Sequence, residues 1–459
     1  MADQKVSASF RDPSGFVFTR QNQLYRQVNK SYQADYELLH ETGLYAELTS
    51  AGLLVSHEEV SIAPAEKSLA YKVLQPERIP FISYAYEWSF SQLKDAALLT
   101  LDLQKRALAR GLWLKDATSA NIQFHHGHPI LIDSLSFEAY PEGQPWTAYR
   151  QFCQHFLAPL ALMALVDVRL SQMLRIQLDG IDLELCSRLL PRGTRFNLGL
   201  LFHIHLHASA QKRYAGRSTS EAATRASVSK MALLGMVDQL ERTIAKLQWK
   251  PIGSAWGNYY AETNYSNAAE THKGELVEKY LKKIKPKSVW DLGANNGLYS
   301  RIAARLGAFT VSQDYDPAAV EQNYLRARAE HETNLHPLLI DLANPSPALG
   351  WANQEREALS QRGAPDALMA LALVHHLAIG NNLPLERIAE FFASLAPWLI
   401  IEFVPKSDSQ VKRLLASRKD IFDDYTLEGF TKAFSKTFKI ETQTSVTESE
   451  RTLFLLKRK

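Results

Sequence analysis

Three carboxylates stand where an apolar run of the chain ends and a polar turn begins. Asp291 follows SVW in SVWDLGANNGLYS (288–300), Asp314 ends the run in VSQDYDP, and Asp341 ends the run in LLIDLANP. A carboxylate accepts two hydrogen bonds at once, so an acid at the end of a strand is suited to hold paired donor groups of a ligand. Junctions at which a strand stops and a helix begins hold dinucleotides, nucleoside triphosphates or sulfonium cofactors.

The loop after Asp291 discriminates between these ligands. A dinucleotide fingerprint requires G-x-G-x-x-G, because the pyrophosphate lies almost on the backbone at the helix N-terminus. Asn295 and Leu298 occupy the second and third glycine positions here. A P-loop requires a lysine directly after its last glycine, and no lysine follows Gly297. Diphosphate cofactors therefore fit this loop poorly.

The run DLGANNG instead resembles motif I of class I S-adenosylmethionine-dependent methyltransferases, D-x-G-x-G-x-G, with asparagine at the middle glycine. The resemblance implies that the backbone passes under the methionine part of the cofactor, while Asp291 helps to hold its amino end. The backbone positions concerned are Gly293, Asn295 and Gly297. This cofactor carries no phosphate, so the absence of a phosphate-binding lysine agrees with the resemblance.

The next two acids agree with the same family in their order along the chain. Asp314 falls where the family places the acid that accepts from both ribose hydroxyls, and Asp341 where an acid accepts from the adenine amino group. Asp316 is a rival for the first role, but Pro317 follows it, which is typical of a helix N-cap. The alternative is a doubly wound domain whose terminal acids are incidental.

Two histidines follow the fourth expected strand, in ALVHHLAIG, where the family faces the methyl group. Methyl transfer is an in-line displacement, so positioning supplies most of the catalysis. An acceptor hydroxyl must also lose a proton, and His375 or His376 is the candidate base. The alternative is that one histidine packs on the sheet while the other shapes the pocket. Glu402, which follows the fifth apolar run in IIEFVP, either faces the substrate or caps a helix or tethers a loop.

An aromatic segment, SAWGNYYAETNY (254–265), precedes the expected methyltransferase domain. Family members often close such a segment over the cofactor, so Tyr259, Tyr260 and Asn264 are candidates for a lid, with Tyr260 as a cofactor contact. A packing patch between domains explains the aromatic residues equally well.

A second motif lies in WLKDATSANIQFHHGHPILIDSLSF (113–137). It resembles the catalytic segment of protein kinase-like and aminoglycoside phosphotransferase-like folds: an aspartate, four residues, an asparagine, a short hairpin and a metal-binding aspartate. Asp116, Asn121 and Asp133 take these positions. The resemblance implies a base or orienting carboxylate at Asp116, and ATP with Mg²⁺ at Asn121 and Asp133.

Several residues depart from this kinase pattern. Only Gly15 stands in the hairpin that would cover the phosphates, and Arg26 falls near the place of the kinase strand lysine. Leu114 replaces the catalytic-loop histidine, and Ser-Leu follows Asp133 in place of Phe-Gly. These departures favour a degenerate module that binds a nucleotide or a partner, or orients a substrate, over an active phosphotransferase.

The remaining histidine groups do not predict a metal site. HHGH (125–128) is expected in a solvated hairpin turn. His203 and His207 are four residues apart, on one helical face, but no third ligand stands near them. A pair on a helix surface is therefore the favoured interpretation.

The elements that position these residues follow from the apolar pattern. From about residue 275, helix-like and strand-like segments alternate, which predicts a parallel sheet covered on both faces. The segments FKIETQTSV and RTLFLLKRK predict a closing β-hairpin. The predicted fold class is α/β: a Rossmann-like doubly wound methyltransferase sheet, preceded by an α+β kinase-like domain. We expect a disordered tail over 1–13, a kinase-like domain with helical lower lobe and connector over 14–247, and a methyltransferase domain over 248–459.

The composition is that of a globular protein. With 459 residues, 46% hydrophobic and 22% charged, the chain is neither disordered nor fibrous. A net charge of +3 is too small to indicate a nucleic-acid partner. Two isolated cysteines, Cys153 and Cys186, and an N-terminus without a secretory signal favour a cytoplasmic location. The most apolar run, 156–166, is too short to span a membrane.

Together these features predict an S-adenosylmethionine-dependent methyltransferase. Its acceptor is unidentified, with a hydroxyl of a glycan or small metabolite as the first hypothesis. The chain as a whole resembles bacterial nodulation-protein-related methyltransferases. The alternatives are a kinase-like phosphotransferase that uses ATP and Mg²⁺ with an accessory methyltransferase fold, and a non-catalytic scaffold that binds S-adenosylmethionine. The sequence does not predict the oligomeric state.

Overall fold

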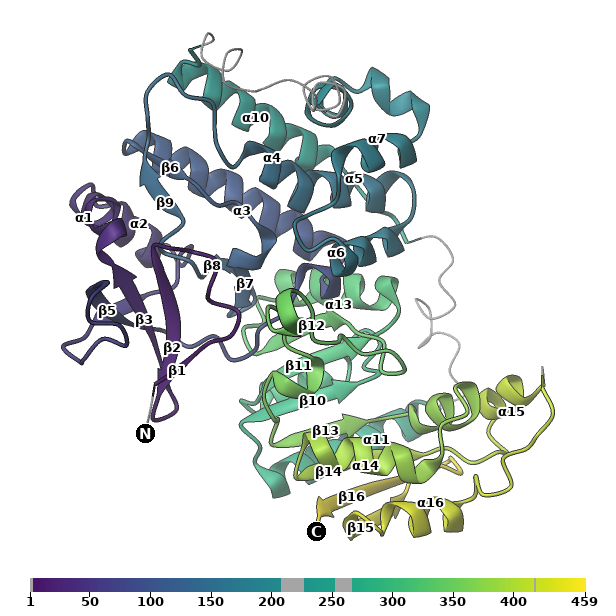
Figure 1. Cartoon of the computed structure of the whole chain (residues 1–459). Coiled ribbons are helices and arrows are strands. Elements are labelled where there is room, and N and C mark those ends of the chain that lie inside the picture. The colour runs from purple at the N-terminus through teal and green to yellow at the C-terminus, as the bar shows by residue number, and fades with distance from the viewer. Residues whose placement is uncertain (1–2, 208–226, 252–265, 417) are drawn as a thin grey trace. The chain divides into compact units, whose positions relative to one another are not determined.

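The computed structural model describes residues 3–207, 227–251, 266–416 and 418–459. The chain divides into two compact units (Figure 1). The first unit comprises residues 1–250 and 348–356, and the second comprises residues 251–347 and 357–459. Both mix helices with strands, so the predicted α/β fold class is confirmed.

The first unit begins with a five-stranded antiparallel sheet. In spatial order the strands are β1 (Gln4–Lys5), β2 (Gly15–Arg20), β3 (Gln23–Asn29), β5 (Ala70–Pro76) and β4 (His57–Glu59). The β2–β3 hairpin closes through Gln21 and Asn22, both at positive φ (51° and 64°). Such a two-residue turn matches the twist of the flanking strands. It leaves no glycine-rich loop between the two strands.

Residues near the N-terminus correct one expectation. The sequence analysis placed residues 1–13 in a disordered tail, whereas Gln4 and Lys5 form β1 and pair with Thr19 and Phe18 of β2. An ion pair also joins Arg20 to Asp3, with Nη2 2.5 Å from Oδ2. Edge pairing of this kind satisfies backbone groups of β2 that would otherwise be open to solvent.

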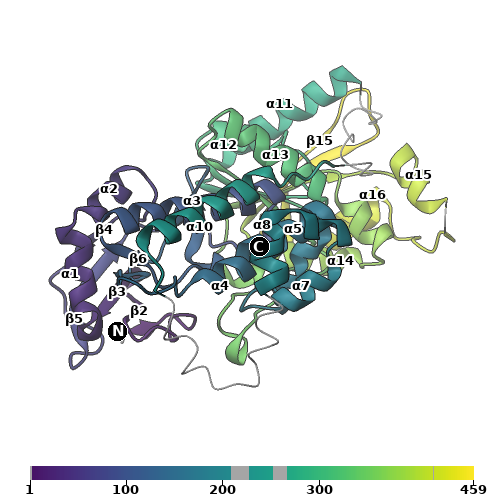
Figure 2. The ribbon, with the colours of Figure 1, turned by 90° about the horizontal axis from the view of Figure 1, so that it is seen from above.

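The remainder of the first unit is mostly helical. Ser89 and Gln92 form a capping box that begins the long helix α3 (Phe90–Ala109). In Figures 1 and 2, α3 runs beside α10 (Lys230–Lys246), and Lys105 of α3 lies 2.6 Å from Asp238 of α10. The other helices are α1 (Gln33–Glu41), α2 (Leu44–Ser50), α4 (Tyr149–Phe152), α5 (Ala158–Leu165), α6 (Met173–Ile176), α7 (Leu183–Leu189) and α8 (Leu198–Leu200).

Two small antiparallel ladders carry the kinase-like motif. They are β6 (Leu112–Leu114) with β9 (Phe137–Ala139), and β7 (Ile122–His125) with β8 (His128–Leu131). His203, expected on a helix surface, is instead buried, and its Nδ1 lies 2.7 Å from the Tyr149 hydroxyl. Both cysteines are buried free thiols.

The second unit contains a seven-stranded sheet. Five parallel strands are followed by an antiparallel pair, so the predicted closing hairpin is confirmed. In spatial order the strands are β12 (Leu335–Leu339), β11 (Phe309–Asp314), β10 (Ser288–Leu292), β13 (Ala367–Ala370), β14 (Trp398–Phe403), β16 (Thr452–Arg458) and β15 (Phe438–Ser445). The chain order reverses between β10 and β13, where a doubly wound sheet opens a crevice at the carboxyl ends of its strands.

Helices cover both faces of this sheet. Figure 1 shows α11 and α14 on opposite faces. Buried side chains of α11 pack with Val289, Met369 and Ile400 of three neighbouring strands. The helices of the unit are α11 (Asn267–Ile284), α12 (Ser300–Arg305), α13 (Pro317–Ala329), α14 (Leu385–Leu395), α15 (Ser409–Leu415) and α16 (Leu427–Phe434). Strands covered on both sides read as continuous apolar runs, which is why β13 and β14 were recognisable in the sequence. None of the helices in the described ranges combines the length and apolar character needed to span a bilayer.

Candidate functional site

A cavity of about 350 Å³ lies in the second unit, at the carboxyl ends of β10, β11 and β13. Polar groups line it from several strand ends, beside an apolar wall that includes Leu371, Leu373 and Leu377. The predicted residues among its lining are Asp291, Gly293, Asn295, Asp314, Asp341 and His376. Gly297, His375 and Glu402 are absent from it. A cavity of this size lies within the range of ordinary ligand pockets, about 300–1,000 Å³.

The loop after β10 owes its shape to three positive-φ residues. Gly293 (φ 71°), Asn295 (φ 51°) and Gly297 (φ 77°) all adopt the left-handed conformation. Asparagine tolerates this conformation better than most side chains, which explains how Asn295 replaces the motif glycine. A Cβ on Gly297 would lie 2.5 Å from the Asn323 side chain of α13. Gly297 therefore permits close packing of the loop on a helix, while Gly293 and Asn295 face the cavity.

Asp314 joins this loop to the end of β11. Its Oδ2 accepts from the Asn295 amide at 2.7 Å, and its Oδ1 accepts from the Asp316 amide at 2.9 Å. Each carboxylate oxygen has a further lone pair for a ligand. Burial raises the pKa of Asp314 to about 6, although these backbone hydrogen bonds oppose the shift. Asp316 instead accepts from the Ala318 amide as the N-cap of α13, the structural role that Pro317 suggested.

The two other acids differ in their surroundings. Asp291 is buried, and its Oδ2 accepts from the Ser300 hydroxyl at 2.6 Å. Burial raises the pKa of Asp291 to about 7. Asp341 is exposed at the cavity rim, and its Oδ1 accepts from the Ala343 amide at 2.8 Å. The structure thus places two buried carboxylates and one exposed carboxylate around the same space.

The two histidines take different places. His376 lines the cavity, whereas His375 is fully buried behind it, with the ring centroids 4.1 Å apart. Burial lowers the pKa of His376 to about 4, and it holds the pKa of His375 well below its usual range. Neither ring nitrogen of His375 has a hydrogen-bond partner among the described residues. His376 is therefore the histidine that a ligand in the cavity would meet.

Glu402 does not face the cavity, contrary to one of the two expectations for it. It is fully buried, and its Oε2 lies 2.7 Å from Nζ of Lys273. Lys273 does line the cavity, with its ammonium 4.6 Å from the centre of the Tyr299 ring. Burial lowers the pKa of Lys273, and the charge of Glu402 opposes that shift. Glu402 thus acts on the cavity through Lys273.

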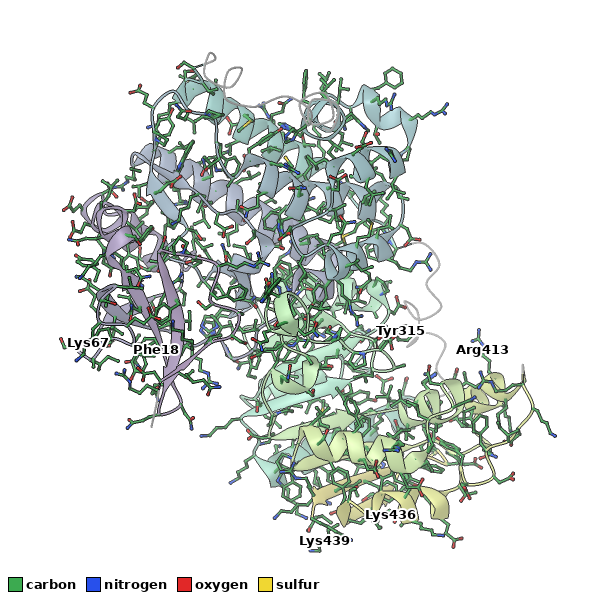
Figure 3. All side chains as sticks on the ribbon, in the orientation of Figure 1. Phe18, Lys67, Tyr315, Arg413, Lys436 and Lys439 are labelled. Atoms are coloured by element: carbon green, nitrogen blue, oxygen red, sulfur yellow. The ribbon has the colours of Figure 1, made fainter. Side chains whose placement is uncertain are left out.

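Among the cavity residues that sequence reasoning missed, the charged or aromatic ones are Glu270, Lys273, Tyr299 and Tyr315. A signal for Lys273 was present, because it interrupts an otherwise apolar stripe of α11 formed with Ala269, Val277 and Tyr280. Tyr315, labelled in Figure 3, directly follows Asp314 and is 57% exposed. The proposed lid residues Tyr259, Tyr260 and Asn264 lie outside the described residues.

The kinase-like residues of the first unit lie near one another, and one of them is paired with a cation. Asp116 is half-buried, and burial and then the charge of Asp133 raise its pKa, while Asn121 donates to it. Asp133 Oδ1 lies 2.5 Å from Nη2 of Arg26, with side chains 17% and 12% exposed. Arg26 thus occupies the place at which Asp133 would bind Mg²⁺. The residues present do not fit a magnesium ion in this arrangement.

The β2–β3 hairpin, which corresponds to the phosphate-covering hairpin of kinases, is also tightly packed. A Cβ on Gly15 would lie 2.2 Å from the Gln27 carbonyl oxygen and 2.8 Å from Cδ1 of Leu135. Leu135 follows Asp133 by two residues and packs in a buried cluster with Val28, Tyr32 and Leu74. An apolar side chain therefore lies against the hairpin that covers phosphates in kinases.

Comparison with known proteins finds a relative that is similar to this chain over nearly its full length. The chain is 36% identical over 461 residues to nodulation protein NoeA of Rhizobium meliloti (strain 1021), covering 99% of this chain and 96% of that protein. No family model matches the chain.

Solved structures resemble it more distantly, and similarity at this level does not bear on the site. Magnesium protoporphyrin IX methyltransferase (ChlM) from Synechocystis PCC 6803 matches with 17% identity, TM-score 0.30, over 44% of this chain and 89% of its own. N-methyltransferase NodS from Bradyrhizobium japonicum WM9 matches with 9% identity, TM-score 0.32, over 42% and 98%. The bifunctional kinase-methyltransferase WbdD matches with 14% identity, TM-score 0.30, over 42% and 40%.

Proposed function

The chain belongs to the family of nodulation protein NoeA, and on that premise we propose that its second unit is an S-adenosylmethionine-dependent methyltransferase. The observation that carries the proposal is the cavity at the sheet edge, lined by acids from three successive strand ends beside a positive-φ loop. The domain division proposed with it is a methyltransferase domain over 248–459 and a degenerate kinase-like domain over 14–247.

The donor set suits this cofactor in charge and shape. Asp291, Asp314 and Asp341 face the cavity with one buried cation, Lys273, so their excess negative charge favours a sulfonium ligand. Asp314 would accept from the two ribose hydroxyls and Asp341 from the adenine amino group. Asp291 and the loop at Gly293 and Asn295 would hold the amino acid end. Gly293 has a positive φ and carries no side chain, so the backbone can approach the ligand closely at this point.

Positioning accounts for most of the proposed chemistry. When bound, the cofactor supplies an electrophilic methyl group for an in-line displacement. His376 lines the cavity, and burial lowers its pKa to about 4, so its ring is neutral at pH 7 and can act on an acceptor hydroxyl as a weak base that accepts its hydrogen. His375 supports its ring from behind. The apolar wall at Leu373 and Leu377 excludes water from the reacting groups.

A hydroxyl of a glycan or small metabolite remains the proposed acceptor. The chief rival is a scaffold that binds the cofactor without turnover. A phosphotransferase using ATP and Mg²⁺ is disfavoured, because Arg26 holds the carboxylate on which the metal would depend. No specific observation favours the phosphotransferase over the methyltransferase.

Calorimetry of the full chain tests the proposal. S-Adenosylmethionine should bind to the wild-type protein, and Asp314→Asn should weaken binding at least tenfold, because the isosteric amide carries no charge. Asp420→Ala, which removes an exposed acid of the same unit outside the cavity, is the matched control and should leave the affinity unchanged.

Methyl release to candidate hydroxyl acceptors then separates the enzyme from the scaffold. Loss of turnover in His376→Ala with unchanged cofactor affinity would support a base at this position. Equal cofactor affinity in the Asp314→Asn and wild-type proteins would refute the site.

A further inference from the structure

The HHGH turn brings three metal-ligand side chains together in the first unit. His126 and Gly127 join β7 to β8 with positive φ angles of 49° and 79°. The turn places the rings of His125 and His126 with their centroids 3.9 Å apart. Glu77 directly follows β5, and its Oε1 lies 3.0 Å from Nε2 of His125. Residues 48 positions apart in the sequence therefore converge at this turn.

The three donors are close enough for a single ion. One ligand atom from each of Glu77, His125 and His126 lies within 4.8 Å of the others. In a tetrahedral zinc site with bonds of about 2.0–2.2 Å, neighbouring donors are about 3.4 Å apart. The largest separation here therefore exceeds that value by at most about 1.4 Å, which rotation of a surface side chain can close.

Hydrogen bonds orient the Glu77 carboxylate toward the histidines. Ser56 Oγ donates to Oε2 of Glu77 at 3.0 Å, which leaves Oε1 directed at the histidines. The side chains of His125 and Glu77 are 10% and 46% exposed. One ligand is thus held in place, and the site is open to ions from solvent.

We propose that Glu77, His125 and His126 form a binding site for a first-row divalent cation, for which Zn²⁺ is the best match. Two imidazoles and one carboxylate are a ligand set that zinc accepts, with water in the fourth position. The ion would link the end of β5 to the β7–β8 hairpin, and so join the antiparallel sheet to the helical half of the first unit. It would use none of the residues of the kinase-like site, and it is independent of the proposed methyl transfer.

Zinc titration of the chelator-stripped full chain tests this site. Calorimetry with ZnCl₂ should show one tight ion per chain, and saturation should raise the melting temperature. His126→Ala and Glu77→Gln should each weaken binding at least tenfold. Ser56→Ala should weaken it by about tenfold, the lower end of the effect of losing an outer hydrogen bond to a ligand. His128→Ala changes an exposed histidine on the same hairpin outside the cluster, and should bind zinc as the wild type does.

The control variant His128→Ala distinguishes zinc binding at the three proposed ligands from nonspecific zinc binding by surface histidines. In the presence of a chelator, the melting temperature should be the same for the wild type and all variants. If His126→Ala lowers the melting temperature even without zinc, Glu77→Gln, which keeps the shape of the side chain, replaces it as the test variant. The proposal is overturned if the wild type binds no stoichiometric zinc. It is equally overturned if His128→Ala weakens binding as much as His126→Ala does.

Discussion

The buried ion pair between Lys273 and Glu402 offers a quantitative test of the charges beneath the cavity. The two charged atoms lie 2.7 Å apart, and the side chains are 3% and 0% exposed. Removing one partner of a buried ion pair costs about 3–5 kcal/mol, because the other charge remains buried and unpaired. Arg451 Nη1 lies 3.8 Å from Oε1 of Glu402 and offers partial compensation. We therefore expect Lys273→Met to cost about 3 kcal/mol, at the low end of that range.

A double-mutant cycle isolates the pairwise contribution. Glu402→Gln leaves the ammonium of Lys273 buried without its carboxylate, at a similar cost. The variant with both substitutions buries neither charge of the pair. It should therefore be more stable than the sum of the single costs predicts, by about 2 kcal/mol, within the range measured for residues in contact.

Hydrogen exchange read by mass spectrometry suits this measurement. The two units need not unfold together, so a single melting curve is a poor guide, whereas peptides from α11 and β14 report on the second unit alone. A loss of about 3 kcal/mol corresponds to roughly 100-fold faster exchange. If the double variant shows costs that add to within about 0.5 kcal/mol, the two side chains are not coupled and the account of Glu402 acting through Lys273 is refuted.

Three further predictions follow from single contacts. Gly297→Ala should destabilise the protein by more than 1 kcal/mol, through positive φ and a clash; Gly307→Ala, where a Cβ meets nothing within 4 Å, should cost less in thermal unfolding. Because burial raises the pKa of Asp314 to about 6, the cofactor-free fold favours its protonated form below that pH. Burial also raises the pKa of Asp291 to about 7, so the affinity for S-adenosylmethionine should fall progressively as the pH drops from 8 to 5; a flat calorimetric profile over that range would contradict this. Arg26→Ala should release Asp133, so that electron paramagnetic resonance detects more bound Mn²⁺ per chain in this variant than in the wild type.

Strand ends were predictable because of how parallel sheets are built. Strands covered on both faces are largely apolar, so β10, β11 and β12 appear as mainly apolar segments with an aspartate at or near their carboxyl ends. This signal, together with the resemblance to the methyltransferase motifs, singled out Asp291, Asp314 and Asp341, and the structure places all three at one cavity. Motif glycines carry a second kind of information, since a positive φ is needed wherever the chain turns tightly.

Side-chain direction and long-range partners were not predictable in the same way. Glu402 ends an apolar run as the other acids do, but it points to Lys273 and away from the cavity. The chain near Gln4 lacks a strong strand pattern and forms β1 only because β2 presents an open edge. The HHGH turn was assigned to solvent because Glu77, its partner, stands 48 residues from His125.

The two units each contain an aspartate that matches a family motif, but the charges next to these aspartates differ. Asp133 matches a metal-binding position. However, Arg26, which stands 107 positions earlier in β3, lies 2.5 Å from its carboxylate and neutralises it. Asp314 matches a cofactor position and receives only backbone amides, so burial raises its pKa to about 6. A desolvated carboxylate of this kind gains free energy from a ligand that donates hydrogen bonds, whereas a paired one must first lose its arginine. On this physical ground ligand binding is expected at the second unit's acids, and the first unit's motif is expected to serve structure.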